Sequence, residues 1–248
     1  MRLIALQEVD STNTYLEREA PQIEDTVMVT AYSQTAGHGQ RGNGWESAPG
    51  QNLTFSVLYH PTSFRAIDQF SISEATALAV VDLIAIHGVE AKVKWPNDIY
   101  VGDKKICGIL IKHSLMGSEI SHSILGVGIN INQTFFVSDA PNPISLMQIT
   151  GESYNLEALT SEIAGCLGIR LEMIYGEQNR LALHDEFMRK LWRGDGNFHA
   201  FSDTATGEKF NAVIDSIGLD GVLTLRLNDF SLRPYRFKEV SFLLPNKN

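Results

Sequence analysis

The sequence predicts an α+β domain followed by a small β domain. The first part of the chain mixes consecutive strand-like segments with long helical ones, an arrangement more typical of α+β than of doubly wound α/β folds. From residue 198 to 244 the chain is strand-like throughout and is punctuated by turn signals such as Asp220-Gly221. Its character changes at Gly194-Asp195-Gly196. We therefore expect a larger domain at 1–195 and a small β domain at 196–248.

The predicted elements of the first domain follow in order. A short strand at Leu3–Leu6 leads into a helix that carries Tyr15 and Leu16 and is capped by Asp10 or Ser11. Apolar residues at helical spacing predict a long helix over 66–87, which Gly88 ends. Runs rich in β-branched and aromatic residues predict the other strands. The remaining segments are strands at 26–32, 53–59, 93–95, 99–101, 106–112 and 123–131, and helices at 156–175 and 181–192.

Composition limits the classes of partner. The 248 residues include 20 Lys plus Arg against 29 Asp plus Glu, for a net charge of −9. Such an acidic chain is unsuited to coating nucleic acid or docking on an anionic membrane, so we expect neither DNA nor membrane as a partner. No apolar run approaches the roughly 18 residues that span a bilayer. Cys107 and Cys166 lie among apolar residues and predict reduced thiols, so we expect a cytoplasmic protein.

A glycine-rich stretch lies between the strands predicted at 26–32 and 53–59. Residues 37–44 hold four glycines, and G-H-G-Q-R-G formally matches the dinucleotide pattern G-x-G-x-x-G. A dinucleotide loop opens directly into a helix, whereas this stretch continues as NGWESAPG, so we reject a Rossmann site. Bare backbone N–H groups and Arg41 suit a phosphate or carboxylate, and the indole of Trp45 suits a flat heterocycle. The alternative is a surface loop with turn glycines.

Positive charge is concentrated between residues 92 and 112. Five lysines occur there against Asp98 and Asp103, and alternation puts Lys92 and Lys94 on one face of a strand. One interpretation is a solvated edge strand, and the other is a cationic sheet face that neutralises phosphates.

Two further short segments carry two interpretations each. Ser11, Thr12 and Asn13 suit either a helix cap or a ring of donors and acceptors around a polar heterocycle such as a urea. Gly126 and Gly128 leave two positions of a strand bare, which indicates either a close ligand or a packed helix.

Taken together and in this order, these stretches resemble biotin protein ligases. K-W-P-N-D followed by K-x-x-G-I-L is the most specific part of the resemblance, which covers about residues 1–195, and the terminal β segment resembles the family's SH3-like C-terminal domain. The resemblance implies a mixed sheet flanked by helices, as in class II synthetases and biotin–lipoate ligases. The segments that carry it are DSTNTYL (10–16), SQTAGHGQRGNGW (33–45), GQNLTFSV (50–57), KWPNDIYVGDKKICGIL (94–110) and GVGININ (126–132).

The resemblance implies an ATP-dependent, AMP-forming biotin–[biotin carboxyl-carrier protein] ligase. Such an enzyme activates biotin to biotinyl-5′-adenylate and transfers biotin to one lysine of the carrier domain of a biotin-dependent carboxylase. Biotin, ATP and Mg²⁺ would be its ligands, with the metal ligands unknown. The first family segment begins at Asp10, so we expect a monofunctional ligase without a DNA-binding domain, as a monomer or homodimer.

The resemblance also implies roles for individual residues. Lys105 would contact the reacting carboxylate and the α-phosphate, and Asp98 would help to deprotonate the incoming lysine. Lys94 and Arg41 complete the predicted catalytic set. The predicted binding residues are Ser11, Thr12, Asn13 and Gln34 for the ureido ring, Gly37, His38, Gly39 and Gln40 over the carboxylate and phosphate, Trp45 and Asn130 for the nucleotide, and Asn97 and Gly108 in the lining.

The glycine loop departs from the family's commonest form, G-R-G-R-R-G. His38 and Gln40 replace its first two arginines, so we expect Arg41 to be the main charged latch of a loop that orders over its ligand. Two alternatives stay open. A lipoate–protein ligase uses the same adenylation chemistry, although its ligand has no ureido group for the polar triplet to bind. A non-catalytic biotin- or nucleotide-binding regulator would not need the full set of lysines.

Overall fold

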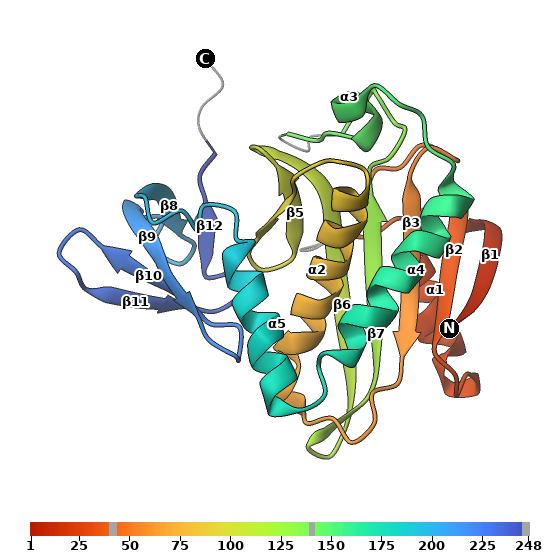
Figure 1. Cartoon of the computed structure of the whole chain (residues 1–248), viewed down its shortest axis with the longest axis horizontal. Helices are drawn as coiled ribbons and strands as arrows, with labels where there is room; N and C mark the ends of the chain where they lie inside the picture. The colour runs from red at the N-terminus through yellow and green to blue at the C-terminus, as the bar shows by residue number, and fades with distance from the viewer. Residues whose placement is uncertain (40–43, 139–141, 245–248) are drawn as a thin grey trace.

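The computed structural model describes residues 1–39, 44–138 and 142–244. Within them the main feature is a mixed sheet of seven strands, in the order β1-β2-β3-β7-β6-β5-β4 (Figure 1). β1 and β2 pair in parallel, and the other neighbours are antiparallel. The strands are β1 (Arg2–Val9), β2 (Val27–Gln34), β3 (Leu53–Tyr59), β4 (Lys92–Lys94), β5 (Asp98–Val101), β6 (Lys104–Met116) and β7 (Glu119–Ile129).

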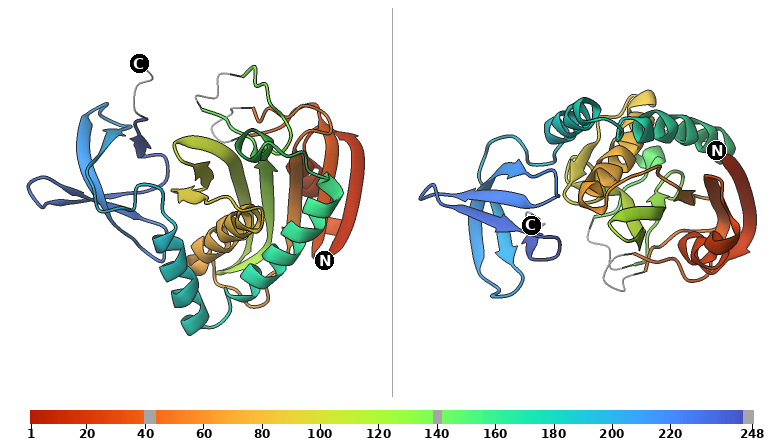
Figure 2. Two further views of the ribbon diagram at one scale, coloured as in Figure 1. Left: turned by 45° about the horizontal axis from the view of Figure 1, so that its top comes forward. Right: turned by 90° about the horizontal axis from the view of Figure 1, so that it is seen from below.

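Helices cover this sheet unequally. α2 (Phe70–Ile86), α4 (Leu156–Glu172) and α5 (Glu177–Arg189) form one layer across one face, whereas α1 (Thr12–Glu19) lies against β3 and β7 on the other (Figures 1 and 2). The alternation of β3 accounts for the two faces. Phe55 and Val57 pack into the core with α2, and Thr54 and Ser56 face the side of α1. The part of that second face that α1 leaves uncovered is available to a ligand.

The central helix α2 is apolar on all sides because it is enclosed. It lies between the sheet and the helices α4 and α5 (Figure 2). Together with a preceding 3₁₀ turn at Ala66–Asp68, it forms a helical stretch, Ala66–Ile86, that is long and apolar enough to cross a membrane. An 18-residue window within this stretch has a mean hydropathy of 1.5. The expectation that no run approaches that length was therefore wrong. Packing explains the composition, since 72% of this window is buried inside the structure.

A second, antiparallel sheet follows the last helix. Its order is β11-β10-β9-β8-β12 in the described residues, and it stands beside the β4 end of the first sheet (Figure 1). Trp95 Nε1 donates a hydrogen bond of 3.1 Å to the carbonyl of Gly221, which ties the two sheets together. The strands are β8 (His199–Asp203), β9 (Lys209–Ile217), β10 (Leu223–Leu227), β11 (Leu232–Tyr235) and β12 (Val240–Phe242).

The expected fold class is confirmed: a mixed sheet flanked by helices with a C-terminal β unit. The division at residue 195 stays a prediction. One helix was missed, α3 (Leu146–Thr150), which is short but begins with a capping box formed by Ser145 and Gln148. The cap expected for α1 differs in detail, because Ser11 occupies the N-cap position without a side-chain hydrogen bond to the helix. Cys107 and Cys166 are both free thiols.

Candidate active site

A cavity of about 760 Å³ lies on the α1 face of the first sheet, next to β12. This volume is within the usual range for a small-molecule site. Gly37 is not part of the lining, but its carbonyl accepts a 2.9 Å hydrogen bond from the amide of the lining residue Trp45. Gln40 and Arg41 lie outside the described residues. The other predicted site residues all line the cavity: Ser11, Thr12, Asn13, Gln34, His38, Gly39, Trp45, Lys94, Asn97, Asp98, Lys105, Gly108 and Asn130.

Beside the first turn of α1 the cavity has a buried polar end. The amide of Thr12 donates to Gln34 Oε1 at 2.8 Å, and the Thr12 hydroxyl lies 2.7 Å from that of Ser56. Ser56 Oγ donates to Asn13 Oδ1 at 2.6 Å, and Asn13 Nδ2 donates to the carbonyl of Leu110 at 3.3 Å. These side chains hold one another in place instead of capping the helix. They offer a ligand both donors and acceptors, as a urea requires.

Sequence reasoning missed Ser56. It is fully buried on β3, in the cavity, at the inward position two residues after Thr54. The signal was the polar alternation in an otherwise apolar strand, since a hydroxyl at an inward position needs a hydrogen-bond partner.

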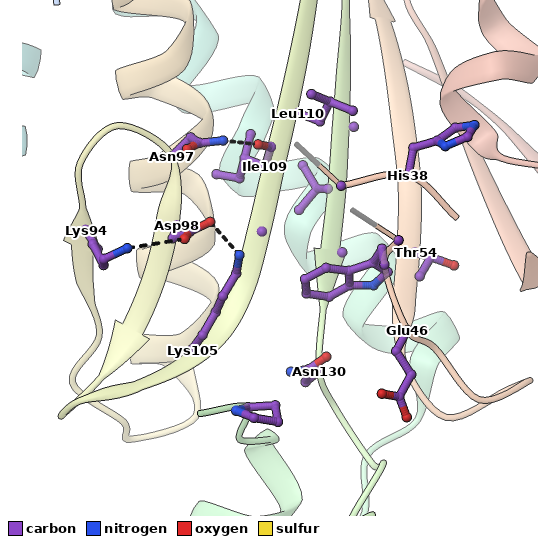
Figure 3. A pocket seen from close by; sticks show the side chains of 18 of the residues that line it. His38, Glu46, Thr54, Lys94, Asn97, Asp98, Lys105, Ile109, Leu110 and Asn130 are labelled. Carbon is purple, nitrogen blue, oxygen red and sulfur yellow. Dashed lines mark hydrogen bonds and ion pairs between the residues drawn. The ribbon is translucent and has the colours of Figure 1, made fainter. Parts of the chain in front are cut away.

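Two lysines share one carboxylate. Asp98 Oδ1 lies 2.7 Å from Lys105 Nζ, and Asp98 Oδ2 lies 3.7 Å from Lys94 Nζ (Figure 3). Strand register explains the arrangement, because Lys94 pairs with Asp98 across β4 and β5 while β6 brings Lys105 alongside. The three side chains carry one net positive charge at the cavity wall. The solvated-edge interpretation therefore fails for Lys94 and Lys105, although it holds for the exposed Lys92.

Lys94 is the more enclosed of the two lysines. Its ammonium group lies 5.2 Å from the ring centre of Tyr100 and 5.5 Å from that of Phe242. Burial lowers the pKa of Lys94, and the charge of Asp98 partly opposes that effect. Burial also raises the pKa of Tyr100 to about 12. Asn97 fixes the adjoining turn, since its side-chain amide donates to the carbonyl of Ile109 while its own carbonyl accepts from the Ile109 amide.

Three strand glycines, Gly108, Gly126 and Gly128, lie directly beneath the side chains of Trp45 and Asn13. A Cβ at Gly128 would overlap the indole of Trp45, and one at Gly108 would lie 2.9 Å from it. A Cβ at Gly126 would overlap the side chain of Asn13 on α1. Helix packing thus accounts for Gly126, and Gly128 makes room for the indole of Trp45, while the close approach of a ligand stays a prediction.

Buried polar atoms without partners cluster at the end of the cavity away from α1. Within the described ranges four such atoms are found, and three of them, Trp45 Nε1, Asn130 Oδ1 and Asn142 Oδ1, belong to cavity residues, whereas His60 Nε2 lies elsewhere. Unpaired buried donors and acceptors are costly, so their presence in a cavity indicates groups that a ligand completes. His38, by contrast, is exposed and points away from the lysines (Figure 3).

The second sheet also contributes to the wall. Phe237, Val240, Ser241 and Phe242 line the cavity, and Phe242 lies next to Lys94. No sequence signal linked these residues to the site, because they follow Lys94 by more than 140 positions and belong to β12 or to the turn before it.

Comparison with known proteins identifies the family. Residues 5–130 match the model of the biotin/lipoate A/B protein ligase family, so the chain belongs to that family. The bifunctional ligase/repressor BirA of Bacillus spizizenii is 31% identical over 146 residues, which are 56% of this chain and 44% of that protein. The biotin–[acetyl-CoA-carboxylase] ligase of Mycobacterium tuberculosis is 32% identical over 156 residues, 60% of this chain and 56% of the relative. The chain thus spans roughly half the length of these relatives.

Solved structures share the whole fold. A biotin protein ligase from Aquifex aeolicus in complex with biotin and ATP superimposes with a TM-score of 0.79, at 22% identity, over 97% of both chains. A biotin protein ligase from Leishmania major in complex with biotinyl-5-AMP has a TM-score of 0.65, at 21% identity, over 95% of this chain and 98% of that one. The likeness includes the C-terminal sheet and confirms the expected SH3-like unit.

Proposed function

We propose that this chain is a biotin protein ligase, which activates biotin with ATP and then transfers it to a lysine of a carboxyl-carrier domain. The observation that carries the proposal is one cavity with two chemically distinct parts. One part is the uncharged polar relay of Thr12, Ser56 and Asn13, and the other is the cationic wall of Lys94 and Lys105. A urea fits the first part, and a carboxylate beside phosphates fits the second.

The first half-reaction joins two anions, which sets the protein's task. A biotin carboxylate oxygen attacks the α-phosphorus of ATP, an acyl–phosphate bond forms, and pyrophosphate leaves. Lys105 would neutralise the charge shared between the carboxylate and the α-phosphate. Asp98 would keep Lys105 and Lys94 at a fixed separation without cancelling both charges. Alignment and charge neutralisation suffice for this step, and no covalent protein nucleophile is needed.

The second half-reaction is an acyl transfer. The amine of the carrier lysine attacks the biotinyl carbonyl, an amide forms, AMP leaves, and one proton is lost from the nitrogen. Asp98 is our candidate for assisting that proton, because its carboxylate is in the cavity wall. Trp45 and Asn130 would hold the adenine, since they supply an aromatic face and an unpaired acceptor.

The protein ligands of the expected Mg²⁺ stay unassigned. The described residues contain no group of three or more His, Cys, Asp or Glu side chains that could hold a metal. The cavity carboxylate nearest the lysines, Asp98, is already flanked by both of them. We therefore derive no step through a protein-bound metal.

The experiment that tests this function distinguishes biotin from lipoate as the activated substrate. Pyrophosphate release is measured with ATP and either biotin or lipoate, followed by a streptavidin blot of a carboxyl-carrier domain and of the same domain with its acceptor lysine changed to alanine. We expect pyrophosphate with biotin only and label on the unaltered carrier only. A preference for lipoate would favour the rival ligase, and no pyrophosphate with either would favour a binding protein.

A further inference from the structure

A short apolar segment follows β7 and lies at the edge of the cavity. Phe136 lines the cavity, while Phe135 and Val137 on either side of it are 76% and 75% exposed. Burial of these neighbours therefore does little to fix the backbone of residues 134–138, and other contacts must place Phe136.

Those contacts come from the carboxylate of Glu46, which directly follows Trp45 in the sequence. Glu46 Oε2 accepts from the amide of Ser138 at 2.8 Å, and Glu46 Oε1 accepts from the amide of Val137 at 2.9 Å and from Gln133 Nε2 at 3.0 Å. Within the described residues no ion pair of Glu46 is present, so three N–H groups hold it in place of a cation. Partial burial raises the pKa of Glu46, but these hydrogen bonds outweigh burial and the net shift is downward.

Gln133 extends the same connection to β3. Its Oε1 accepts from the amide of Ala48 at 2.9 Å and from Asn52 Nδ2 at 2.6 Å. Asn52 Oδ1 in turn accepts from the amide of Ile131 at 3.0 Å. The stretch that follows Trp45 and the segment that follows β7 are therefore joined at several points, with Glu46 at the end nearest Phe136.

Glu46 connects two aromatic residues of the cavity, Trp45 and Phe136. Glu46 is the residue after Trp45, and the amides it holds belong to the two residues after Phe136. We propose that Glu46 is a positioning residue, which keeps the aromatic rings of Trp45 and Phe136 at the nucleotide end of the cavity. The role rests on the proposed function, because the flat heterocycle that these rings would hold is the adenine of ATP. Glu46 also lines the cavity (Figure 3), and its carboxylate oxygens accept from the N–H groups of Gln133, Val137 and Ser138.

Glu46→Gln is the discriminating variant. It preserves the size of the side chain but replaces one carboxylate oxygen with an NH₂ group, which cannot accept from a backbone N–H. We expect the amides of Val137 and Ser138 to exchange with deuterium about tenfold faster in this variant, in line with the loss of a charge-assisted hydrogen bond. Glu152→Gln, which alters an exposed carboxylate elsewhere, is the matched control and should leave both amides unchanged.

Kinetics provide the readout that a purely structural role would not move. We expect Glu46→Gln to raise the KM for ATP roughly tenfold while the KM for biotin changes less than about twofold, since the polar relay lies at the other end of the cavity. Phe136→Ala should show the same split. The double variant should be little worse than either single one, because Glu46 acts through Phe136.

The outcomes separate the two claims. Unchanged amide exchange in Glu46→Gln, or an equal rise in both KM values, would overturn the role of Glu46. If the wild-type protein forms no adenylate, the proposed function fails, and the amide exchange alone then decides whether Glu46 holds the segment.

Discussion

Asp98 holds the cationic wall of Lys94 and Lys105 together, because each of its carboxylate oxygens lies beside one of the two lysines. Without Asp98, the ammonium groups of Lys94 and Lys105 would repel each other at the cavity wall. With a second carboxylate beside them, the wall would have no net positive charge to attract phosphates. One carboxylate between two ammonium groups leaves a single net positive charge in a fixed place. Preorganised charge of this kind requires little rearrangement when the transition state forms.

Lys105→Ala tests that arrangement at a single residue. We expect biotinyl-adenylate formation to fall by about 30- to 1000-fold, since one charge-assisted contact made in the transition state is worth roughly 2–4 kcal/mol. The melting temperature should change little, because Lys105 is partly exposed and its partner Asp98 keeps Lys94 nearby. Initial rates of pyrophosphate release measure the effect. A rate within twofold of wild type would contradict this role.

Some residues of the site could be predicted from the sequence and others could not. The lysines and Asn97-Asp98 could be predicted because they stand in one short, distinctive segment and their charge is unusual for an acidic chain. Ser56 and Phe242 could not, because their roles depend on which strand faces the cavity and on where the second sheet docks. Glu46 gave no signal either, since its partners are two backbone amides and one side-chain amide, all more than 80 positions away.

The helical layer contains a buried ion pair that joins two elements. Glu74 on α2 is only 1% exposed, and its Oε1 lies 2.6 Å from Nδ1 of His184 on α5. The hydrogen bond with Glu74 raises the pKa of His184, an effect that partial burial opposes. Stability from protonated His184 is therefore fully present below its ordinary pKa of 6.5 and is lost as the pH rises through the higher pKa of the folded state.

His184→Ala should destabilise the protein by about 2–4 kcal/mol at pH 7, because it leaves Glu74 buried without a partner. The cost should shrink as the pH rises through the raised pKa of His184, because the wild-type imidazole then becomes neutral and its ion pair with Glu74 is lost in any case. Urea denaturation at pH 7 and at pH 9 measures it. His87→Ala is the control, since its partner Glu162 is 36% exposed by side chain, and we expect a loss below about 1 kcal/mol. Equal losses at the two pH values would contradict the account.

At the level of elements, periodicity predicted almost every strand and helix that carries the site. The buried helix α2 and the strand β3 were clear because their apolar patterns are long and continuous. Alternation could not tell whether Ser11, Thr12 and Asn13 cap α1 or face a ligand, since the same polar groups suit both. The structure shows that the Ser11 side chain makes no cap hydrogen bond and that Thr12 and Asn13 bond to Ser56 in the cavity, and ligand binding by these residues stays a prediction.

Viewed as a whole, the molecule closes its cavity with a second sheet. Phe242 on β12 lies over Lys94, and its ring packs 5.9 Å from that of Trp192 and 4.9 Å from that of Phe201. The C-terminal sheet thus forms part of the cavity wall and covers Lys94. The sequence predicted that this sheet exists, but docking depends on contacts between residues that are distant in the chain.

Phe242→Ala should therefore impair catalysis from outside the first sheet. We expect kcat/KM for adenylate formation to fall by roughly tenfold, because water then reaches Lys94 and weakens its electrostatic contribution. The melting temperature should fall by a few degrees as packing is lost. Phe230→Ala, at a phenylalanine of the same sheet that is 77% exposed, is the control and should change neither quantity. Equal behaviour of the two variants would separate the C-terminal sheet from the reaction.

Activation of biotin can be observed directly by mass spectrometry of a mixture of the protein, biotin and Mg-ATP without any carrier. We expect biotinyl-5′-adenylate, formed together with pyrophosphate and greatly reduced in Lys105→Ala. Folded wild-type protein that binds both ligands yet yields no biotinyl-adenylate would contradict that expectation.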